Sequence, residues 1–167
     1  MIIDIFNKRD NNKKLLIADR DGTLNIDCGY PHKIKDLYLI ETTIDILKLY
    51  KNKFQLAIVT NQSGIGRGYY TLNQARRFNE ELVKRLELLN IIVTTIATCP
   101  HDPIEECNCR KPKPLMIYKS IEINNVQKSR TFMIGDKKSD LLAANSASVK
   151  YDDVKNKLTK LKEWIQQ

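Results

Sequence analysis

Short apolar segments alternate along the chain with amphipathic segments of helical spacing. Strands are predicted at residues 15–18, 55–59, 91–97, 131–134 and 147–151. Helices are predicted at residues 41–51, 71–89, 114–123 and 141–145, with a last one lined by Val154, Leu158, Leu161 and Ile165. Strands that alternate with helices favour right-handed crossovers. The pattern therefore predicts an α/β protein, with a parallel sheet covered by helices on both faces.

The clearest amphipathic helix is predicted to begin after Thr71. Thr71 and Gln74 have the spacing of a capping box. The apolar residues that follow at helical intervals are Ala75, Phe78, Leu82, Leu86 and Leu89. At the start of the chain, residues 1–13 hold a short apolar alternation and then a polar run, which is interpreted as either an edge strand or a loose arm.

Two carboxylates end the first predicted strand. Asp19 and Asp21 follow it, with Gly22 and Thr23 directly after, and side chains at the carboxyl end of such a strand point into the crevice where ligands bind. Carboxylates this close repel each other, so a compensating cation is expected, and Mg²⁺ prefers such oxygen ligands. A solvated Asp-Gly turn is the alternative. An EF-hand calcium loop is excluded because Leu24 stands where that loop needs glycine.

Polar clusters follow three further predicted strands. Thr60 and Asn61 end the second, residues 99–111 follow the third, and Asp136 and Asp140 follow the fourth. In a parallel sheet all of these clusters lie along one edge. Together they supply carboxylates, a hydroxyl and a lysine, which are the parts needed to transfer a phosphoryl group. Taken singly, each has a plainer alternative, such as a turn, a helix cap or a solvated lysine.

Composition limits where this chemistry acts. The chain has 167 residues, 42% of them hydrophobic, which fits one globular domain over residues 1–167. We expect a cytoplasmic protein, because no apolar run is long enough to cross a bilayer and the first residues do not resemble a signal peptide. A net charge of +8 favours an anionic partner, either a nucleic acid or a phosphorylated small molecule, but a lysine-rich surface that only solvates the chain explains it equally well.

Four potential metal ligands have the spacing of a zinc site. Cys99, His101, Cys107 and Cys109 supply three thiolates and an imidazole, a closed structural set for Zn²⁺ that leaves no position for water. A disulfide, or cysteines buried by chance, is the alternative, although cytoplasmic cysteines are seldom paired. Cys28 has no partner at such a spacing and is interpreted as a small buried or loop residue.

Motifs in four places resemble those of the haloacid dehalogenase-like phosphohydrolases. They are Asp-Arg-Asp-Gly-Thr at residues 19–23, the strand-ending Thr60, Lys111, and Gly-Asp at residues 135–136. The resemblance covers nearly the whole chain, from about residue 15 to residue 151. It implies a three-layer, Rossmann-like fold. With no bulky insertion after the first strand, we expect no large cap domain and only small loops as a lid.

Three features resemble one branch of that superfamily, the D,D-heptose 1,7-bisphosphate phosphatases and histidinol phosphatases. They are the segment Thr-Asn-Gln-Ser-Gly-Ile-Gly-Arg-Gly at residues 60–68, the cluster of cysteines and histidine, and Cys-Arg-Lys-Pro at residues 109–112. The small zinc-binding loop then spans about residues 99–109. Zn²⁺ there would hold Arg110 and Lys111 beside the phosphate.

The resemblance also implies a role for each catalytic residue. Asp19 would be the nucleophile that takes the phosphoryl group as an aspartyl-phosphate. Asp21 would be the general acid for the leaving alkoxide and then the base for the attacking water. Mg²⁺ would lie on the Asp19 carboxylate, the Asp21 backbone carbonyl and Asp136, while Thr60 and Lys111 would hold phosphoryl oxygens.

Substrate contacts are expected from loops around the same edge of the sheet. The expected contact residues are Asp27, Cys28, Gly29, Tyr30, Asn61, Gln62, Ser63, Arg110 and Lys137. The planar guanidinium of Arg110 suits a second phosphate or sugar hydroxyls. The pattern Asp-x-Gly-Tyr-x-His at residues 27–32 resembles the substrate loop of the heptose group, and it favours D-glycero-D-manno-heptose 1,7-bisphosphate, converted to the 1-phosphate. His32 is assigned to the loop or to packing, since Asp21 already fills the acid–base role.

Several features leave alternatives open. Leu115 and Ser148 replace glycines that are frequent in the heptose group, and the zinc loop is short, as in histidinol phosphatases, so histidinol phosphate is the second candidate substrate. A 3′-phosphatase of nucleic-acid ends shares a segment like residues 60–68, although such enzymes are not expected to carry the zinc cluster. A zinc-stapled binding module without activity is a further alternative. We expect a monomer that acts on a small phosphorylated sugar, with neither a nucleic acid nor a membrane as partner.

Overall fold

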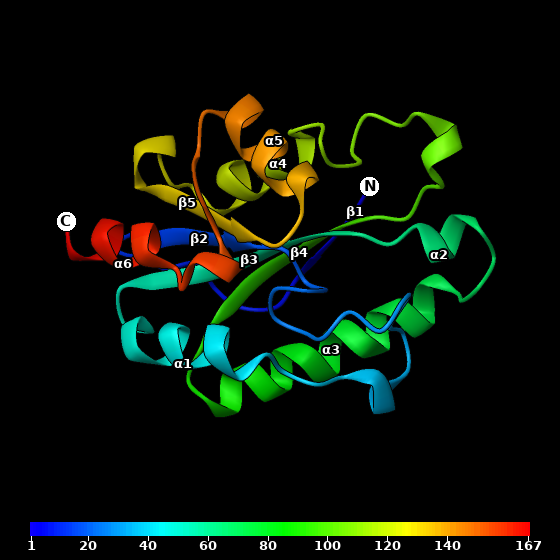
Figure 1. The fold of residues 1–167 in the computed structure, drawn as a ribbon, viewed down its shortest axis with the longest axis horizontal. Coiled ribbons are helices and arrows are strands. Elements are labelled where there is room, and N and C mark those ends of the chain that lie inside the picture. The colour runs from blue at the N-terminus through cyan, green and yellow to red at the C-terminus, as the bar shows by residue number, and fades with distance from the viewer.

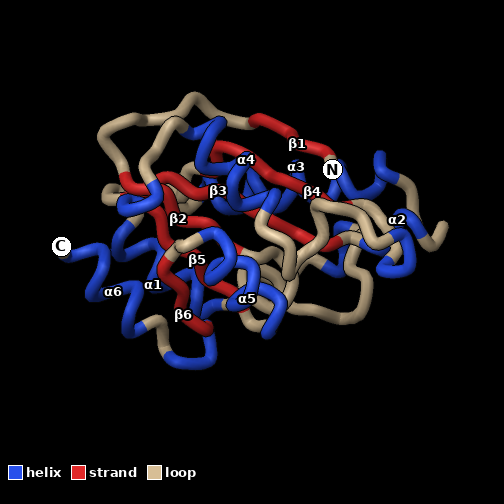
Figure 2. The backbone as a smooth tube through the Cα atoms, turned by 90° about the horizontal axis from the view of Figure 1, so that it is seen from above, coloured by secondary structure: helices blue, strands red, loops and turns tan.

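A six-stranded sheet forms the centre of the protein, and a computed structural model describes all of residues 1–167 (Figure 1). The strands are β1 (Ile2–Ile5), β2 (Lys14–Ala18), β3 (Phe54–Asn61), β4 (Val93–Cys99), β5 (Thr131–Gly135) and β6 (Lys150–Asp153). Their order across the sheet is β1-β4-β3-β2-β5-β6, with β1 antiparallel to β4 and every other neighbouring pair parallel. Figure 2 shows β1 and β6 at the two edges. The predicted parallel sheet is confirmed, and residues 2–5 form an edge strand of it.

Helices cover both faces of the sheet, as the alternating pattern predicts. They are α1 (Glu41–Tyr50), α2 (Ser63–Gly66), α3 (Leu72–Leu88), α4 (Leu115–Asn124), α5 (Lys138–Ala147) and α6 (Thr159–Gln166). Figure 1 shows α4 and α5 above the sheet and α1 and α3 below it. The capping box at Thr71 and Gln74 is present at the start of α3. No helix is both long enough and apolar enough to traverse a lipid bilayer.

Alternate residues of β2 supply two separate hydrophobic cores. Leu16 and Ala18 belong to a core with α1, α3 and α6, while Leu15 and Ile17 belong to a core with α4 and α5. This division follows from the period of two in a strand, which sends successive side chains to opposite faces. All four side chains are fully buried, and each buried Leu or Ile contributes about 2 kcal/mol to stability. The strand that leads to Asp19 is therefore held firmly from both sides.

The last third of the chain differs from the prediction at the ends of its elements. α5 begins at Lys138 rather than at residue 141, because the Asp140 carboxylate accepts a hydrogen bond from the backbone N–H of Lys137 and caps the helix. Ala147 belongs to α5, so β6 starts only at Lys150. The predicted start of the last helix at Val154 is wrong. Residues 154–156 form a 3-10 turn, and positive φ angles at the next two residues delay α6 until Thr159.

Candidate active site

A cavity of about 320 Å³ opens at the carboxyl ends of the parallel strands. Most of the predicted site residues line it. These are Asp19, Asp21, Asp27, Gly29, Tyr30, Thr60, Asn61, Gln62, Ser63, Arg110, Lys111 and Lys137. Cys28 is exposed and is not part of the lining, and Asp136 is not part of it either but lies beside Asp19 and Asp140. Four lining residues were not in the predicted set: Pro31, Tyr70, Ser139 and Asp140.

Lys111 lies between two buried carboxylates at the base of the cavity. Its Nζ is 2.6 Å from Asp19 Oδ1 and 2.7 Å from Asp140 Oδ1, and it donates to the carbonyl of Val59 at 2.9 Å. Burial raises the pKa of Asp19 to about 7, although Lys111 opposes this. Burial alone would lower the pKa of Lys111, but Asp19 and Asp140 outweigh it and raise that pKa. The lysine is therefore a fixed cation at the point where β2 ends.

The segment around Lys111 is tied to the end of β3. The Asn61 amide nitrogen donates to the Lys111 carbonyl, and the Lys111 N–H donates to Asn61 Oδ1, both at 3.1 Å. This reciprocal pair resembles one rung of a sheet ladder. Both polar groups of the Asn61 side chain thus bind the backbone of Lys111. Asn61 therefore positions a residue that is 50 residues away in the sequence.

Arg20 forms a buried clamp on Asp21. Its side chain is fully buried, its Nε donates to Asp21 Oδ1 at 2.9 Å, and an Nη donates to Asp21 Oδ2 at 2.7 Å. The same guanidinium also donates to Asn79 Oδ1 on α3 and to the Pro31 carbonyl, each at 2.9 Å. Such a bidentate contact fixes the plane of a carboxylate as well as its place. The sequence suggested no role for Arg20, because its distant partners are brought together only by the fold.

Three carboxylates at this edge could hold a divalent cation. One oxygen each from Asp19, Asp136 and Asp140 lie within 4.8 Å of one another. Burial raises the pKa of Asp136 as well as that of Asp19, and a bound cation would favour the ionised form of both carboxylates. Gly22 has a φ of +88°, and a Cβ at this position would collide with the Asp136 carboxylate. A hard-oxygen donor set, packed against a residue without a side chain, fits Mg²⁺.

An ion pair joins the predicted substrate loop to the start of α5. The Asp27 carboxylate lies 2.8 Å from Lys137 Nζ and also accepts from the N–H of Gly29 at 3.0 Å. Burial would raise the pKa of Asp27, but the hydrogen bonds from Lys137 and the Gly29 N–H, together with the charges of Lys137 and Arg20, outweigh it and lower that pKa. Beside this pair, the rings of Tyr30 and Tyr69 meet edge to face with centroids 5.1 Å apart. The loop therefore reaches across the cavity mouth and is partly preorganised.

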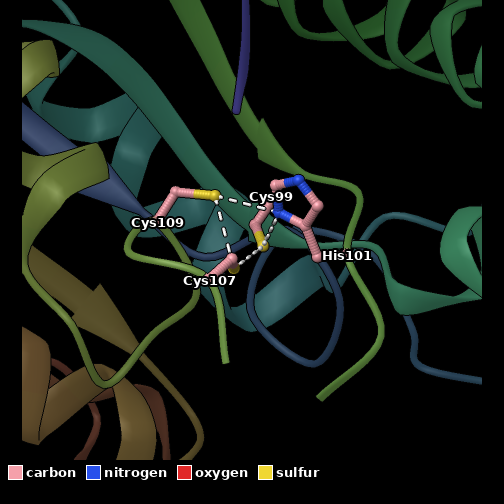
Figure 3. A group of neighbouring side chains, drawn as sticks. All are labelled: Cys99, His101, Cys107 and Cys109. Atoms are coloured by element: carbon pink, nitrogen blue, oxygen red, sulfur yellow. Dashed lines mark hydrogen bonds between the residues drawn. The ribbon is translucent and has the colours of Figure 1, made fainter. Parts of the chain in front are cut away.

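The predicted zinc ligands converge on one point (Figure 3). Sγ of Cys99 is 3.5 Å from Sγ of Cys107 and 3.6 Å from Nδ1 of His101, and Sγ of Cys109 is 3.6 Å and 3.3 Å from the same two atoms. Ligands around a tetrahedral Zn²⁺ are separated by about 3.7 Å, given Zn–S bonds of about 2.3 Å. None of the cysteines is in a disulfide. The donor set fits zinc in both chemistry and spacing.

The electrostatics of the thiols also suit a bound cation. Burial raises the pKa of Cys99 to about 12, so this thiol ionises at neutral pH only beside a positive charge. The pKa of Cys107 is lowered to about 6, because hydrogen bonds from the N–H groups of Cys109 and Arg110 outweigh the effect of burial. Zn²⁺ binding would therefore draw a proton from a buried thiol, as thiolate coordination requires.

Comparisons with known proteins agree with the geometry. Residues 29–154 match the family described as haloacid dehalogenase-like hydrolase. A D-glycero-beta-D-manno-heptose-1,7-bisphosphate 7-phosphatase from Helicobacter pylori is 39% identical over 160 residues, which are 93% of this chain and 92% of the relative. The protein with the same name from Haemophilus ducreyi is 42% identical over 146 residues, 83% of this chain and 80% of the relative.

A solved structure supports the same assignment. The D,D-heptose 1,7-bisphosphate phosphatase from B. bronchiseptica, complexed with magnesium and phosphate, is 28% identical to this chain and superposes with a TM-score of 0.75. The match covers 83% of this chain and 78% of that one. The resemblance seen in the sequence is confirmed, and the non-enzymatic alternative is not supported. The chain belongs to the haloacid dehalogenase-like hydrolase family, and it is a phosphatase.

Proposed function

We propose that this phosphatase removes the 7-phosphate of D-glycero-D-manno-heptose 1,7-bisphosphate and leaves the 1-phosphate. The relatives of about 40% identity that span most of the chain carry the name of this activity. The observation that carries the proposal is the distribution of cations in the cavity. Lys111 lies beside Asp19 at its base, and Arg110 lies in its wall with one guanidinium nitrogen, Nη1, buried and without a hydrogen-bond partner. The free Arg110 nitrogen offers a second phosphate a cationic partner besides the one at the base of the cavity.

In the proposed reaction Asp19 is the nucleophile. A carboxylate oxygen of Asp19 attacks phosphorus, the bond from phosphorus to the sugar oxygen breaks, and Asp21 gives a proton to the leaving alkoxide. Asp21 then takes a proton from a water molecule, whose oxygen attacks the aspartyl-phosphate and releases inorganic phosphate and Asp19. Thr60 and Lys111 hold phosphoryl oxygens in both steps.

Two metal ions are part of the proposal. Mg²⁺ would be held by the Asp19 carboxylate, the Asp21 backbone carbonyl and Asp136, and it supplies positive charge against the phosphoryl oxygens. Asp140 is assigned to Lys111, which it contacts at 2.7 Å. Zn²⁺ would be structural and would hold the segment that begins at Cys109. The expected cytoplasmic location and monomeric state stay predictions.

A substrate panel tests the proposal directly. Phosphate release with Mg²⁺ is measured on the two anomers of heptose 1,7-bisphosphate, on histidinol phosphate and on a 3′-phosphorylated oligonucleotide. We expect the highest kcat/KM on one of the heptose anomers, because only these substrates present a second phosphate on a sugar. Fastest turnover of the oligonucleotide, with the steep salt dependence of nucleic-acid binding, would contradict the proposal. Fastest turnover of histidinol phosphate would support the proposed reaction but would show that histidinol phosphate is the substrate.

The Gly22→Ala variant tests the proposed Mg²⁺ site. A Cβ at residue 22 displaces the Asp136 carboxylate, so the Mg²⁺ concentration for half-maximal activity is expected to rise about tenfold or more, equal to about 1.4 kcal/mol of lost binding. Gly68→Ala is the matched control. Gly68 also has a positive φ, of +72°, but its Cβ would meet no atom within 4 Å. If Gly68→Ala raised the Mg²⁺ concentration for half-maximal activity as much as Gly22→Ala does, backbone strain at a glycine, and not displacement of Asp136, would be the cause.

A further inference from the structure

Gln62 is a buried link between three polar side chains of the cavity. Its Nε2 donates to Asp21 Oδ2 at 2.8 Å and to Thr60 Oγ1 at 2.7 Å. Its Oε1 accepts from the hydroxyl of Tyr70 at 2.6 Å. Only 2% of Gln62 is exposed, so water has little access to it. The amide therefore meets its hydrogen-bonding needs within this group.

The chemistry of the partners sets the direction of these hydrogen bonds. Arg20 donates to both oxygens of Asp21, so the Asp21 side chain serves as an acceptor here, and the amide nitrogen of Gln62 faces it while the amide oxygen faces the hydroxyl of Tyr70. The hydroxyl of Tyr70 then donates, and it keeps its proton at neutral pH because burial raises its pKa to about 12. Since Thr60 Oγ1 accepts from Gln62, the hydroxyl hydrogen of Thr60 stays available for a phosphoryl oxygen in the cavity that it lines.

Two neighbours hold the ring of Tyr70 in place. It stacks on the His32 ring with centroids 4.5 Å apart and an angle of 7° between the planes. It also lies so close to Gly64 that a Cβ there would collide with it. Tyr70 is 4% exposed. Its hydroxyl is thus delivered to Gln62 by a rigid support, and His32 has the packing role expected of it.

We propose that Tyr70 is a positioning residue of the phosphatase, which acts through Gln62 on Asp21 and Thr60. The inference rests on the proposed function, because the roles of Asp21 and Thr60 belong to that proposal. Without the Tyr70 hydroxyl, Gln62 Oε1 becomes a buried acceptor with no partner, which is unfavourable. If the Gln62 amide rotates to find a new partner for Oε1, its N–H groups move away from both Asp21 and Thr60. Both residues then lose the orientation that the reaction uses.

A double-mutant cycle tests this role. kcat and KM are measured for wild type, Tyr70→Phe, Gln62→Met and the double variant, on whichever phosphate ester of the panel the wild type hydrolyses fastest. Tyr70→Phe is expected to lower kcat about tenfold, with KM changed less than twofold. In the Gln62→Met background the same substitution is expected to change kcat by less than twofold, because the link is already absent. Equal losses in both backgrounds, or no loss in the wild-type background, would overturn the proposal.

Two further variants separate this role from a structural one. Tyr118→Phe also removes a hydroxyl, which donates to the Ser146 carbonyl at 2.9 Å outside the cavity, and it should leave kcat unchanged. Gln62→Glu keeps an acceptor for Tyr70, but its carboxyl group carries at most one proton and cannot donate to both Asp21 and Thr60, so its kcat should stay well below that of the wild type. Wild-type kcat in Gln62→Glu would overturn the proposal even if Tyr70→Phe failed to fold. An inactive wild-type enzyme would instead contradict the proposed function itself.

Discussion

Replacement of Asp19 by asparagine is expected to lower phosphatase activity by about 10⁴-fold or more while the protein stays folded. The amide has nearly the shape of the carboxylate but cannot form the aspartyl-phosphate. The fold should tolerate the change because the Asp19 carboxylate is buried at a cost, as its raised pKa of about 7 shows. Lys111 keeps its contacts with Asp140 and the Val59 carbonyl. Phosphate release and thermal melting measure the two parts of this expectation.

The control for this prediction is Asp45→Asn. The Asp45 side chain is 73% exposed on α1 and lies 3.5 Å from Lys48 Nζ, and exposed ion pairs of this kind contribute little to stability. This variant should match the wild type in both measurements. Mass spectrometry of the enzyme quenched during turnover adds a direct readout, a phosphorylated chain in wild type and none in Asp19→Asn. Substantial residual activity in Asp19→Asn would show that another group is the nucleophile.

Zinc is expected to be a structural part of the protein. Metal analysis should find about one Zn²⁺ per chain in protein purified without a chelator. Cys107→Ser should lower zinc content and reduce the Tm by roughly 10 °C, which corresponds to about 3–5 kcal/mol of lost stability in a chain of this size. Activity should fall as well, because Cys109 and Lys111 are two residues apart and the zinc loop holds the lysine against Asp19.

Cys28→Ser is the matched control for the zinc prediction. Cys28 is exposed and lies outside the cluster, so its replacement should change neither the zinc content nor the Tm. If Cys107→Ser melted at the same temperature as Cys28→Ser, the cluster would not be a folding element. Protein that contained no zinc would exclude the proposed metal altogether.

The local patterns of the sequence predicted most of the fold, and the clearest exceptions lie at the ends of elements in the last third of the chain. The four central strands, β2 to β5, are apolar runs and could be located directly, whereas the two edge strands are short and partly polar. The start of α6 could not be read, because Lys157 and Leu158 adopt φ angles of +55° and +50°. These residue types give no sign of a left-handed conformation, unlike glycine or asparagine. Packing in the core supports the conformation of Leu158, which is 1% exposed, whereas Lys157 is exposed.

The candidate site also contains residues that the sequence predicted and residues that it did not. Asp19, Asp21, Thr60 and Lys111 stand in short motifs, and the structure brings all four to one cavity. Arg20 and Tyr70 were missed because no sequence motif links them to their hydrogen-bond partners. Arg20 meets Asn79 across 59 residues, and Tyr70 meets a glutamine whose orientation depends on Asp21. Residues that orient catalytic groups therefore become visible only when hydrogen bonds can be followed in space.

The central place of β2 has a consequence for the motions of the enzyme. β2 pairs with β3 on one side and β5 on the other, and residues 15–18 are fully buried. Amide hydrogens of such a strand exchange with solvent only when the whole sheet opens, whereas exposed loop residues such as Asp27 and Cys28 exchange through local opening. The proposed nucleophile Asp19 thus follows a strand that is expected to exchange slowly, and the predicted substrate loop is expected to exchange fast. Such a loop could admit and release the proposed sugar phosphate without moving Asp19.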